Sequence, residues 1–364
     1  MPDDLIIIAE AGVNHNGSLE RALEMVDVAA AAGADIIKFQ TFSADKLVRK
    51  DAKMAEYQKT SSEDARTQWD LLKGLELSRE EFLAIRDRAA QRGIAFLSTG
   101  FDLDELQFLI DELHIPIVKV ASGDLTFAPM LVKAGTSALP VILSTGMADL
   151  DEIERALGFI AFGRGLTAGV IPAGTVPAAA AVTAAWADPA VRGLLETGVT
   201  ILHCTTQYPA PLEILNLRAM TTIAERFGLP VGYSDHSLGE IASITSVALG
   251  ATVIEKHFTL DKGLEGPDHA ASLEGAELGA FVSSLRDTRT ALGSSIKQCQ
   301  PEEESNREVV RRSIVATRDI AEGAVITEDD IECRRPAAGR TSFDYYELVG
   351  TAATRGYATG DYVG

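Results

Sequence analysis

The sequence predicts an α/β protein built from a (β/α)8 TIM barrel and a small β-rich domain. Eight apolar runs of strand length alternate with segments of helical periodicity along most of the chain. The runs are apolar on both sides, as in parallel strands that are covered on both faces. An open, doubly wound sheet is the alternative. No Gly-x-Gly-x-x-Gly turn follows the first run, which favours the closed barrel.

The predicted strands of the barrel end in polar residues. These strands, some with the loop that follows, are 5–10, 35–40, 94–98, 116–124, 141–146, 199–206, 230–236 and 253–259. Helices are predicted at 19–33, 78–93 and 103–113, from about 149, and at 273–292. Because the carboxyl ends of all strands in such a barrel surround one mouth, the polar strand ends are expected to form one site.

Two segments interrupt the alternation of strands and helices. The polar stretch 43–75 is long for a connection, and it is expected to carry a substrate loop. The Ala-rich stretch at about 161–190 is predicted to form a loop or short helices. A membrane span is not predicted there, because Pro172 and Pro177 interrupt the apolar run.

The pattern changes after the polar, acidic stretch 300–306. Short apolar runs, typical of strands in a small β domain, follow at 312–316, 323–326 and 331–336. The predicted division of the chain is a catalytic barrel at 1–295, a linker at 296–309 and a second domain at 310–364. A domain of that size has a thin core, so it is expected to pack on the barrel of its own chain or of a partner.

The composition limits the partners and the location of the protein. A net charge of −20 argues against nucleic acid and against an anionic membrane surface as partners. Three cysteines without a spacing pattern, and an N-terminus without a basic segment, predict a reducing, cytoplasmic location. Cys204 lies within an apolar run and is expected to be a buried strand residue. An anionic substrate would need a local basic pocket.

Such a pocket is predicted at the strand ends around Lys38 and Lys119. The hydroxyl residues expected at the same mouth are Thr99, Ser122, Ser144 and Ser234. Two ammonium groups among several hydroxyls suit a phosphate or a carboxylate, and a buried lysine without an anion is costly. The alternative is that the two lysines form internal ion pairs with Glu10 and Asp124.

Two histidines, His236 and His257, end the seventh and eighth predicted strands. On neighbouring strands they could share one metal ion, and Mn²⁺, Fe²⁺, Co²⁺ and Zn²⁺ all fit the ligand type. The alternative is that each is an ordinary hydrogen-bonded polar residue. His203 could be a third ligand, a supporting residue or a core residue. The acidic residues at the same mouth, which suit proton transfer or contact with a sugar, are Glu10, Asp124 and Asp268.

These features together resemble the sialic acid (nonulosonic acid) synthases. The matching stretches are 8–18, 37–40, 118–124, 143–147, 202–209, 233–236, 254–258 and 266–268. The stretch 335–339 resembles the C-terminal antifreeze-like (SAF) domain of that family. Each motif alone is modest, but their order and spacing are specific and extend over nearly the whole chain.

The resemblance implies a condensation of phosphoenolpyruvate with an N-acetylated hexose, giving a nonulosonic acid and phosphate with C–O cleavage. It implies that His236 and His257 bind a divalent metal, usually Mn²⁺, and that Glu10 or Asp124 handles the proton. The residues implied to hold phosphoenolpyruvate are Lys38, Thr99, Lys119, Ser122, Ser144, Thr206 and Ser234. Those implied to face the sugar are Gln40, Tyr208, Asp268 and, from the partner's small domain in a domain-swapped homodimer, Arg335.

The chain departs from the family pattern at three positions. Gly100 stands where the family often has Pro, Asp124 where several members have Glu, and Thr206 where some have Asn. The acceptor therefore stays open between N-acetylmannosamine, which gives sialic acid, and a diacetamido-trideoxyhexose, which gives legionaminic or pseudaminic acid. Two other functions remain: a metal-dependent aldolase or hydrolase on the same fold, and a glycan-binding relative without turnover.

Overall fold

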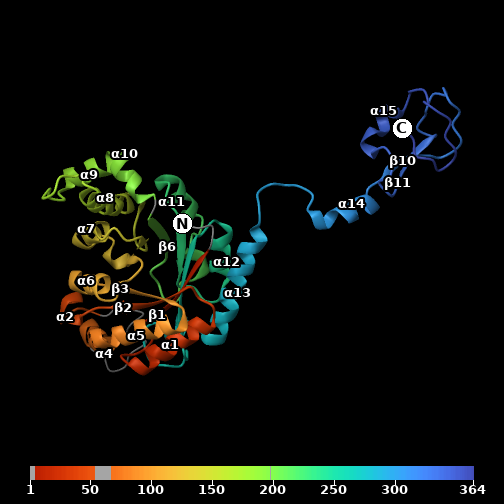
Figure 1. Cartoon of the computed structure of the whole chain (residues 1–364). Coiled ribbons are helices and arrows are strands. Elements are labelled where there is room, and N and C mark those ends of the chain that lie inside the picture. The colour runs from red at the N-terminus through yellow and green to blue at the C-terminus, as the bar shows by residue number, and fades with distance from the viewer. Residues whose placement is uncertain (1–4, 54–66, 197) are drawn as a thin grey trace. The chain divides into compact units, whose positions relative to one another are not determined.

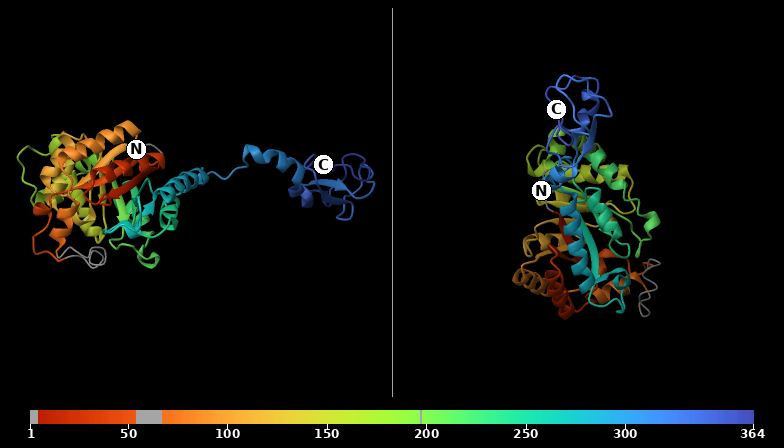
Figure 2. Two further views of the ribbon diagram at one scale, coloured as in Figure 1. Left: turned by 90° about the horizontal axis from the view of Figure 1, so that it is seen from below. Right: turned by 90° about the vertical axis from the view of Figure 1, so that its right-hand side faces the viewer.

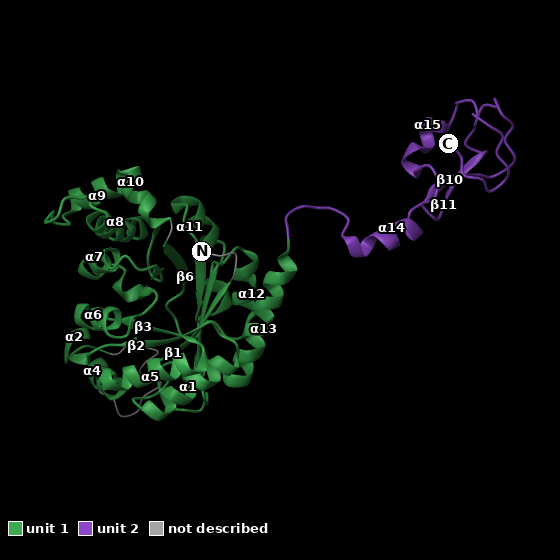
Figure 3. Cartoon of the chain, in the orientation of Figure 1, with its two compact units in different colours: residues 1–293 green, residues 294–364 purple. Residues whose placement is uncertain are grey.

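The computed structural model describes residues 5–53, 67–196 and 198–364. The chain divides into two compact units, Met1–Gly293 and Ser294–Gly364 (Figure 3). The first unit carries the extended apolar core, and the second has a small core of its own. Each unit is described by itself below.

The first unit is a nearly closed barrel of parallel strands, so the predicted fold is confirmed. The strands are β1 (Ile6–Gly12), β2 (Ile36–Thr41), β3 (Ala95–Gly100), β4 (Val118–Val120), β5 (Val141–Ser144), β6 (Val199–Cys204), β7 (Val231–Asp235) and β8 (Val253–Thr259). Their order is β3-β2-β1-β8-β7-β6-β5-β4, with all neighbours parallel. The two ends of this path, β3 and β4, contact each other. Every strand therefore points its carboxyl end toward the same mouth.

Helices form the outer layer around these strands (Figures 1 and 2). These helices include α1 (Leu19–Ala31), α4 (Gln68–Leu75), α5 (Arg79–Arg92), α6 (Leu103–Asp111), α7 (Ala128–Thr136), α8 (Leu150–Thr167), α11 (Ala219–Phe227), α12 (Ile241–Ala248) and α13 (Gly275–Leu292). The predicted start of α5 is confirmed, because Ser78 and Glu81 form a reciprocal capping box there. The predicted helix 273–292 begins two residues late, since Leu273–Glu274 forms the short strand β9 beside β8.

The Ala-rich stretch is helical for much of its length. Helix α8 continues to Thr167, and the short helices α9 (Ala179–Ala187) and α10 (Pro189–Arg192) pack against it. Short helices were one of the two predicted forms. Within the described residues, no helix is both long and apolar enough to cross a membrane.

The second unit contains one antiparallel strand pair, β10 (Ser313–Ala316) and β11 (Ile331–Arg334), and the short helix α15 (Tyr345–Leu348). The prediction of a strand at 323–326 is wrong. Gly323 takes a left-handed turn conformation, and Val325 forms only an isolated bridge with Ala352. The chain therefore turns too soon for a ladder to form. Part of the predicted linker is the helix α14 (Glu304–Val310).

Candidate active site

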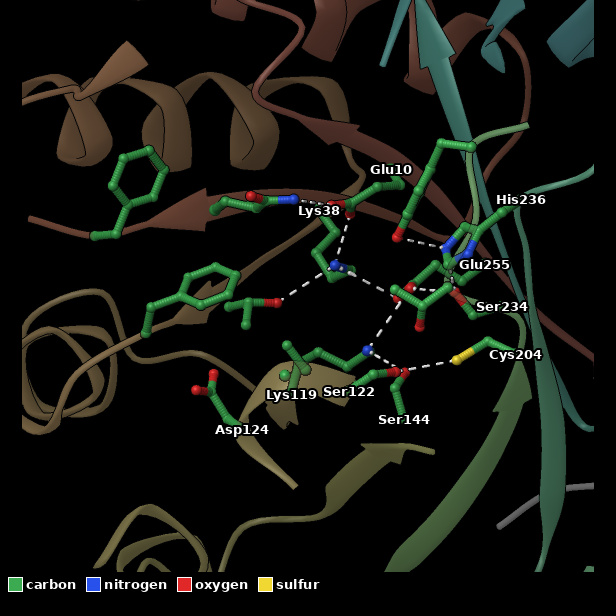
Figure 4. A pocket seen from close by; sticks show the side chains of 18 of the residues that line it. Glu10, Lys38, Lys119, Ser122, Asp124, Ser144, Cys204, Ser234, His236 and Glu255 are labelled. Carbon is green, nitrogen blue, oxygen red and sulfur yellow. Dashed lines mark hydrogen bonds and ion pairs between the residues drawn. The ribbon is translucent and has the colours of Figure 1, made fainter. Parts of the chain in front are cut away.

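The carboxyl ends of the barrel strands surround a cavity of about 600 Å³. Most of the predicted site residues line it (Figure 4). They are Glu10, Lys38, Gln40, Thr99, Lys119, Ser122, Asp124, Ser144, Thr206, Tyr208, Ser234, His236 and His257. The barrel thus brings together, at the ends of its strands, side chains from widely separated parts of the sequence.

Two predicted site residues do not line this cavity. Asp268 is buried beside it, with Oδ2 3.9 Å from Nδ1 of His257. Arg335 belongs to the second unit, directly after β11. Its contact with a sugar stays a prediction.

The predicted substrate loop contributes to the wall of the cavity through its described ends. Leu47 and Val48 lie on one side of the gap in the described chain, and Gln68 and Leu72 lie on the other. Residues 54–66 of the predicted loop lie outside the described residues. The long excursion between β2 and α5 therefore reaches the mouth of the barrel.

Both predicted lysines are buried, and each has a carboxylate partner. Lys38 Nζ lies 2.8 Å from Glu10 Oε2 and 3.5 Å from Glu255 Oε2. Lys119 Nζ lies 3.6 Å from Glu255 Oε1 and donates to Ser144 Oγ at 2.6 Å. The predicted alternative of internal pairing therefore holds for Lys38 with Glu10. It is wrong for Lys119, whose partner is Glu255 in place of Asp124.

Glu255 is a charged residue of the cavity that the sequence did not bring out. It bridges the two lysines and accepts a hydrogen bond from Ser234 Oγ at 2.8 Å (Figure 4). Side chains alternate across a strand, so Glu255 shares the inner face of β8 with His257, two residues later. That alternation was a sequence signal that could have found it.

The charges of this group follow from burial and pairing. Burial alone would favour neutral forms, but Glu10 and Glu255 raise the pKa of Lys38. Burial lowers the pKa of Lys119. Although burial opposes ionisation, Lys119 and Lys38 hold the pKa of Glu255 at about 2. Burial raises the pKa of Glu10 to about 7, because Lys38 only partly replaces the lost solvation. Glu255 is thus a fixed anion, and Glu10 is poised to exchange a proton near neutral pH.

A second carboxyl group with a raised pKa lies after β4. Asp124 closes the 3-10 turn Ser122–Asp124, and its Oδ2 atom is buried without a hydrogen-bond partner within the described chain. Burial raises its pKa to about 6. A partly desolvated carboxyl group at a cavity wall suits general acid–base chemistry.

The two histidines form the other side of the cavity. Their ring centroids are 5.7 Å apart. Nδ1 of His236 donates to the carbonyl oxygen of Thr205 at 2.7 Å, which leaves the lone pair on Nε2, 3.2 Å from the hydroxyl oxygen of Tyr208. Burial lowers the pKa of both histidines, so both rings are neutral. Neutral imidazoles are the form that binds a metal ion.

His203 does not join this pair. Its Nε2 atom is hydrogen-bonded to the carbonyl oxygen of Leu215 at 2.7 Å, while the next residue, Cys204, lines the cavity. Cys204 is buried, as predicted. No cluster of three or more metal-ligating side chains occurs among the residues that the structure describes. Among the described residues, His236 and His257 are thus the imidazole pair that could hold an ion.

Close packing explains one departure from the family pattern. A Cβ atom at Gly100 would lie 2.9 Å from the backbone nitrogen of Leu106. Helix α6 therefore rests directly on the end of β3, beside Thr99. The larger ring of a proline at this position would require α6 to move.

The family is shown by comparison with known proteins. Residues 25–297 match the NeuB family, and residues 311–363 match the SAF domain. The N,N'-diacetyllegionaminic acid synthase of Legionella pneumophila is 42% identical, over 97% of this chain and 92% of its own length. The human N-acetylneuraminate-9-phosphate synthase is 33% identical, over 94% and 87%. The crystal structure of N-acetylneuraminic acid synthetase from Leptospira borgpetersenii matches with a TM-score of 0.66 and 32% identity, over 83% and 90%.

The fold and the site define a barrel enzyme with lysines on one side of its cavity and histidines on the other. The chain belongs to the NeuB family and is an enzyme of the sialic, legionaminic and pseudaminic acid synthase type, with a C-terminal SAF domain. The resemblance predicted from the motifs is thereby confirmed.

Glu10 makes the stability of the barrel depend on pH. Its pKa is about 7 in the folded protein against an ordinary 4.5. Between those values the folded protein binds more protons than the unfolded chain, so the free energy of unfolding falls as pH rises. The free energy of unfolding of Glu10→Gln lacks this dependence. As pH rises from about 5 to about 8, the difference between the two proteins should therefore shift in favour of the variant, by up to about 3 kcal/mol.

Urea unfolding of both proteins across this pH range measures the effect. Glu20→Gln, which changes an exposed carboxylate on α1, is the control and should follow the unaltered protein. A difference between Glu10→Gln and the unaltered protein that does not change with pH would contradict the raised pKa.

Proposed function

We propose that the enzyme condenses phosphoenolpyruvate with a diacetamido-trideoxyhexose, giving a legionaminic-type nine-carbon acid and phosphate. The observation that carries this proposal is the single cavity with two buried ammonium groups on one side and two neutral imidazoles on the other. Ammonium groups suit the anionic phosphoenolpyruvate, and neutral imidazoles can hold an ion that polarises the aldehyde of the sugar. The two legionaminic acid synthases are 42% and 40% identical to the chain, whereas the pseudaminic and N-acetylneuraminate-9-phosphate relatives are 31–33% identical, which supports this acceptor.

The lysine side would hold phosphoenolpyruvate. Lys38 and Lys119 supply positive charge, and Glu255 keeps their two ammonium groups beside each other. The hydroxyl groups that can donate to the phosphate or the carboxylate are those of Thr99, Ser122, Ser144, Thr206 and Ser234. A cradle of this kind binds an anion firmly in spite of the acidic protein around it.

The histidine side fits a divalent metal, and Mn²⁺ is the ion that we propose. The Nε2 atom of His236 lies within hydrogen-bond distance of the hydroxyl groups of Tyr208 and Ser234, which an ion would have to displace from its lone pair. Nδ1 of His257 is buried without a hydrogen-bond partner in the described chain. When bound, the ion would polarise the aldehyde oxygen of the open-chain sugar. Tyr208 and Gln40, on the wall of the same cavity, would hold the sugar, as would Asp268, which lies beside His257.

The carboxyl groups complete the reaction. The C3 carbon of phosphoenolpyruvate forms a bond with the aldehyde carbon, and the aldehyde oxygen takes up a proton. Glu10, with a pKa of about 7, can supply that proton. Water then adds to C2 and loses its proton to Asp124, whose pKa is about 6. The bond from C2 to the phosphate oxygen then breaks, so phosphate leaves with that oxygen. The hydroxyl group that water left on C2 loses its remaining proton to the departing phosphate and becomes the keto group of the acid.

The assembly follows the same resemblance. We propose a homodimer in which Arg335 of the partner's SAF domain contacts the N-acetyl group of the sugar. A guanidinium group suits an amide oxygen. The cytoplasmic location also stays a prediction.

The proposed reaction predicts strict dependence on phosphoenolpyruvate. With Mn²⁺, the purified chain should release phosphate fastest with the diacetamido-trideoxyhexose, more slowly or not at all with N-acetylmannosamine, and should form a nine-carbon acid visible by mass spectrometry. In H₂¹⁸O the label should enter the acid and not the phosphate, because the C–O bond is the one that breaks. Turnover without phosphoenolpyruvate would favour the aldolase or hydrolase, and no phosphate with any sugar would favour the glycan-binding relative.

The metal site predicts a sharp difference between two histidines. His236→Ala should abolish turnover that depends on Mn²⁺, because it removes one of the two proposed imidazole ligands. His203→Ala is the matched control: it changes a histidine on the neighbouring strand that is turned toward Leu215. It should keep its response to added Mn²⁺. Equal responses of the two variants to Mn²⁺ in the phosphate assay would disprove this ligand assignment.

Glu255 predicts a specific loss of phosphoenolpyruvate binding. Glu255→Gln removes the charge that joins Lys38 and Lys119, so their mutual repulsion is no longer balanced. We expect kcat/KM for phosphoenolpyruvate to fall tenfold or more, with a smaller change in the KM for the sugar. Glu277→Gln, which breaks a surface ion pair with Lys262, should leave both constants unchanged. An unchanged KM for phosphoenolpyruvate in Glu255→Gln would remove Glu255 from this role.

A further inference from the structure

A buried ion pair on the outer face of the barrel lies next to both histidines and takes no part in the proposed reaction. Asp235 Oδ2 and Lys256 Nζ are 3.0 Å apart, with side chains 0% and 1% exposed. Asp235 immediately precedes His236, and Lys256 immediately precedes His257. The two residues of the pair are also register partners on β7 and β8.

The preceding register pair is joined on the opposite face. Ser234 and Glu255 pair across the same two strands, and Ser234 Oγ donates to Glu255 Oε1 at 2.8 Å inside the cavity (Figure 4). The strands β7 and β8 are therefore held together on both faces at two successive positions. The next side chains along each strand are those of the two histidines.

The outer pair also holds the chain beyond His236. Asp235 Oδ1 accepts hydrogen bonds from the backbone nitrogen of Ser237 at 2.8 Å and from its Oγ at 2.7 Å. Lys256 Nζ donates to the carbonyl oxygen of Ser237. Asp235 Oδ2 accepts from Ser243 Oγ of α12 at 2.6 Å. These contacts fix the backbone on both sides of His236. They include Lys256, which is the residue before His257.

Stability alone gives little reason for such a pair. Two ions taken out of water lose solvation that their attraction only partly returns, and apolar residues of similar size often serve a core equally well or better. A buried pair with several hydrogen bonds does fix one geometry among its members. Here the members flank the two predicted metal ligands.

We propose that Asp235 and Lys256 are positioning residues that set the separation and orientation of His236 and His257, and through them the affinity for the divalent ion. This inference rests on the metal site of the proposed function. Replacing residues that orient the ligands of a metal ion typically weakens metal binding about 10- to 100-fold.

The test measures metal binding to metal-free protein, without turnover. Mn²⁺ is titrated into the full chain, and free Mn²⁺ is followed by electron paramagnetic resonance. Lys256→Met should weaken binding about tenfold or more. Asp35→Asn is the control, because it breaks an ion pair with Arg286 at the amino end of β2, away from the mouth. It should leave the affinity for Mn²⁺ unchanged.

A second variant distinguishes weakened metal binding from a failure to fold. Lys256→Met leaves Asp235 buried and unpaired, whereas Asp235→Asn with Lys256→Met removes both charges and keeps an amide for Ser237. The double variant should fold and should show the same weakened binding. Unweakened binding in a folded double variant would overturn the inference while the metal site stands. Failure of the unaltered chain to bind Mn²⁺ would overturn the metal site, and the inference with it.

Discussion

The carboxylate of Glu255 is the interaction on which the site depends. Two ammonium groups buried in one cavity repel each other and lose solvation, and a single anion between them offsets both costs. Glu255 does this from β8, while the lysines come from β2 and β4 and Ser234 comes from β7. Four strands of the barrel are thereby joined at their carboxyl ends by charge-assisted contacts.

This arrangement explains how an acidic protein can bind an anion. The long-range field of a chain with a net charge of −20 opposes a phosphate, but local contacts in a cavity of low dielectric outweigh a field that salt screens. The same burial that encloses the two lysines keeps the imidazoles neutral. One cavity therefore presents ammonium groups on one side and neutral imidazoles on the other.

The fold and most of the candidate site could be predicted from the sequence, because both follow from local patterns. Apolar runs with polar ends fix the strands, and the geometry of a closed parallel barrel places their ends together. Glu255 was missed because it lies inside an apolar strand and not at its polar end. Its spacing of two residues from His257 nevertheless indicates that both side chains face the inside of the barrel. The partner of Lys119 depends on which strands face each other across the mouth, and a linear pattern does not show that.

The errors in the small domain have a different physical cause. Its segments are short, so one turn residue decides whether a strand or an isolated bridge forms, as at Gly323 and Val325. Residues such as Arg335 act, in the proposed dimer, through contacts between chains, and strand and helix periodicity carries no information on those contacts.

In the proposed reaction, the coupling between Lys38 and Glu10 would link the binding of phosphoenolpyruvate to the protonation of Glu10. Lys38 Nζ lies 2.8 Å from Glu10 Oε2, and this attraction opposes the effect of burial on Glu10. A phosphate that binds beside Lys38 competes for the same ammonium group and adds negative charge near Glu10. Both effects raise the pKa of Glu10 further, so the anion favours the protonated acid. The aldehyde oxygen of the sugar needs a proton when the carbon–carbon bond forms. In the proposed reaction, Glu10 would therefore be best prepared to supply that proton while phosphoenolpyruvate is bound.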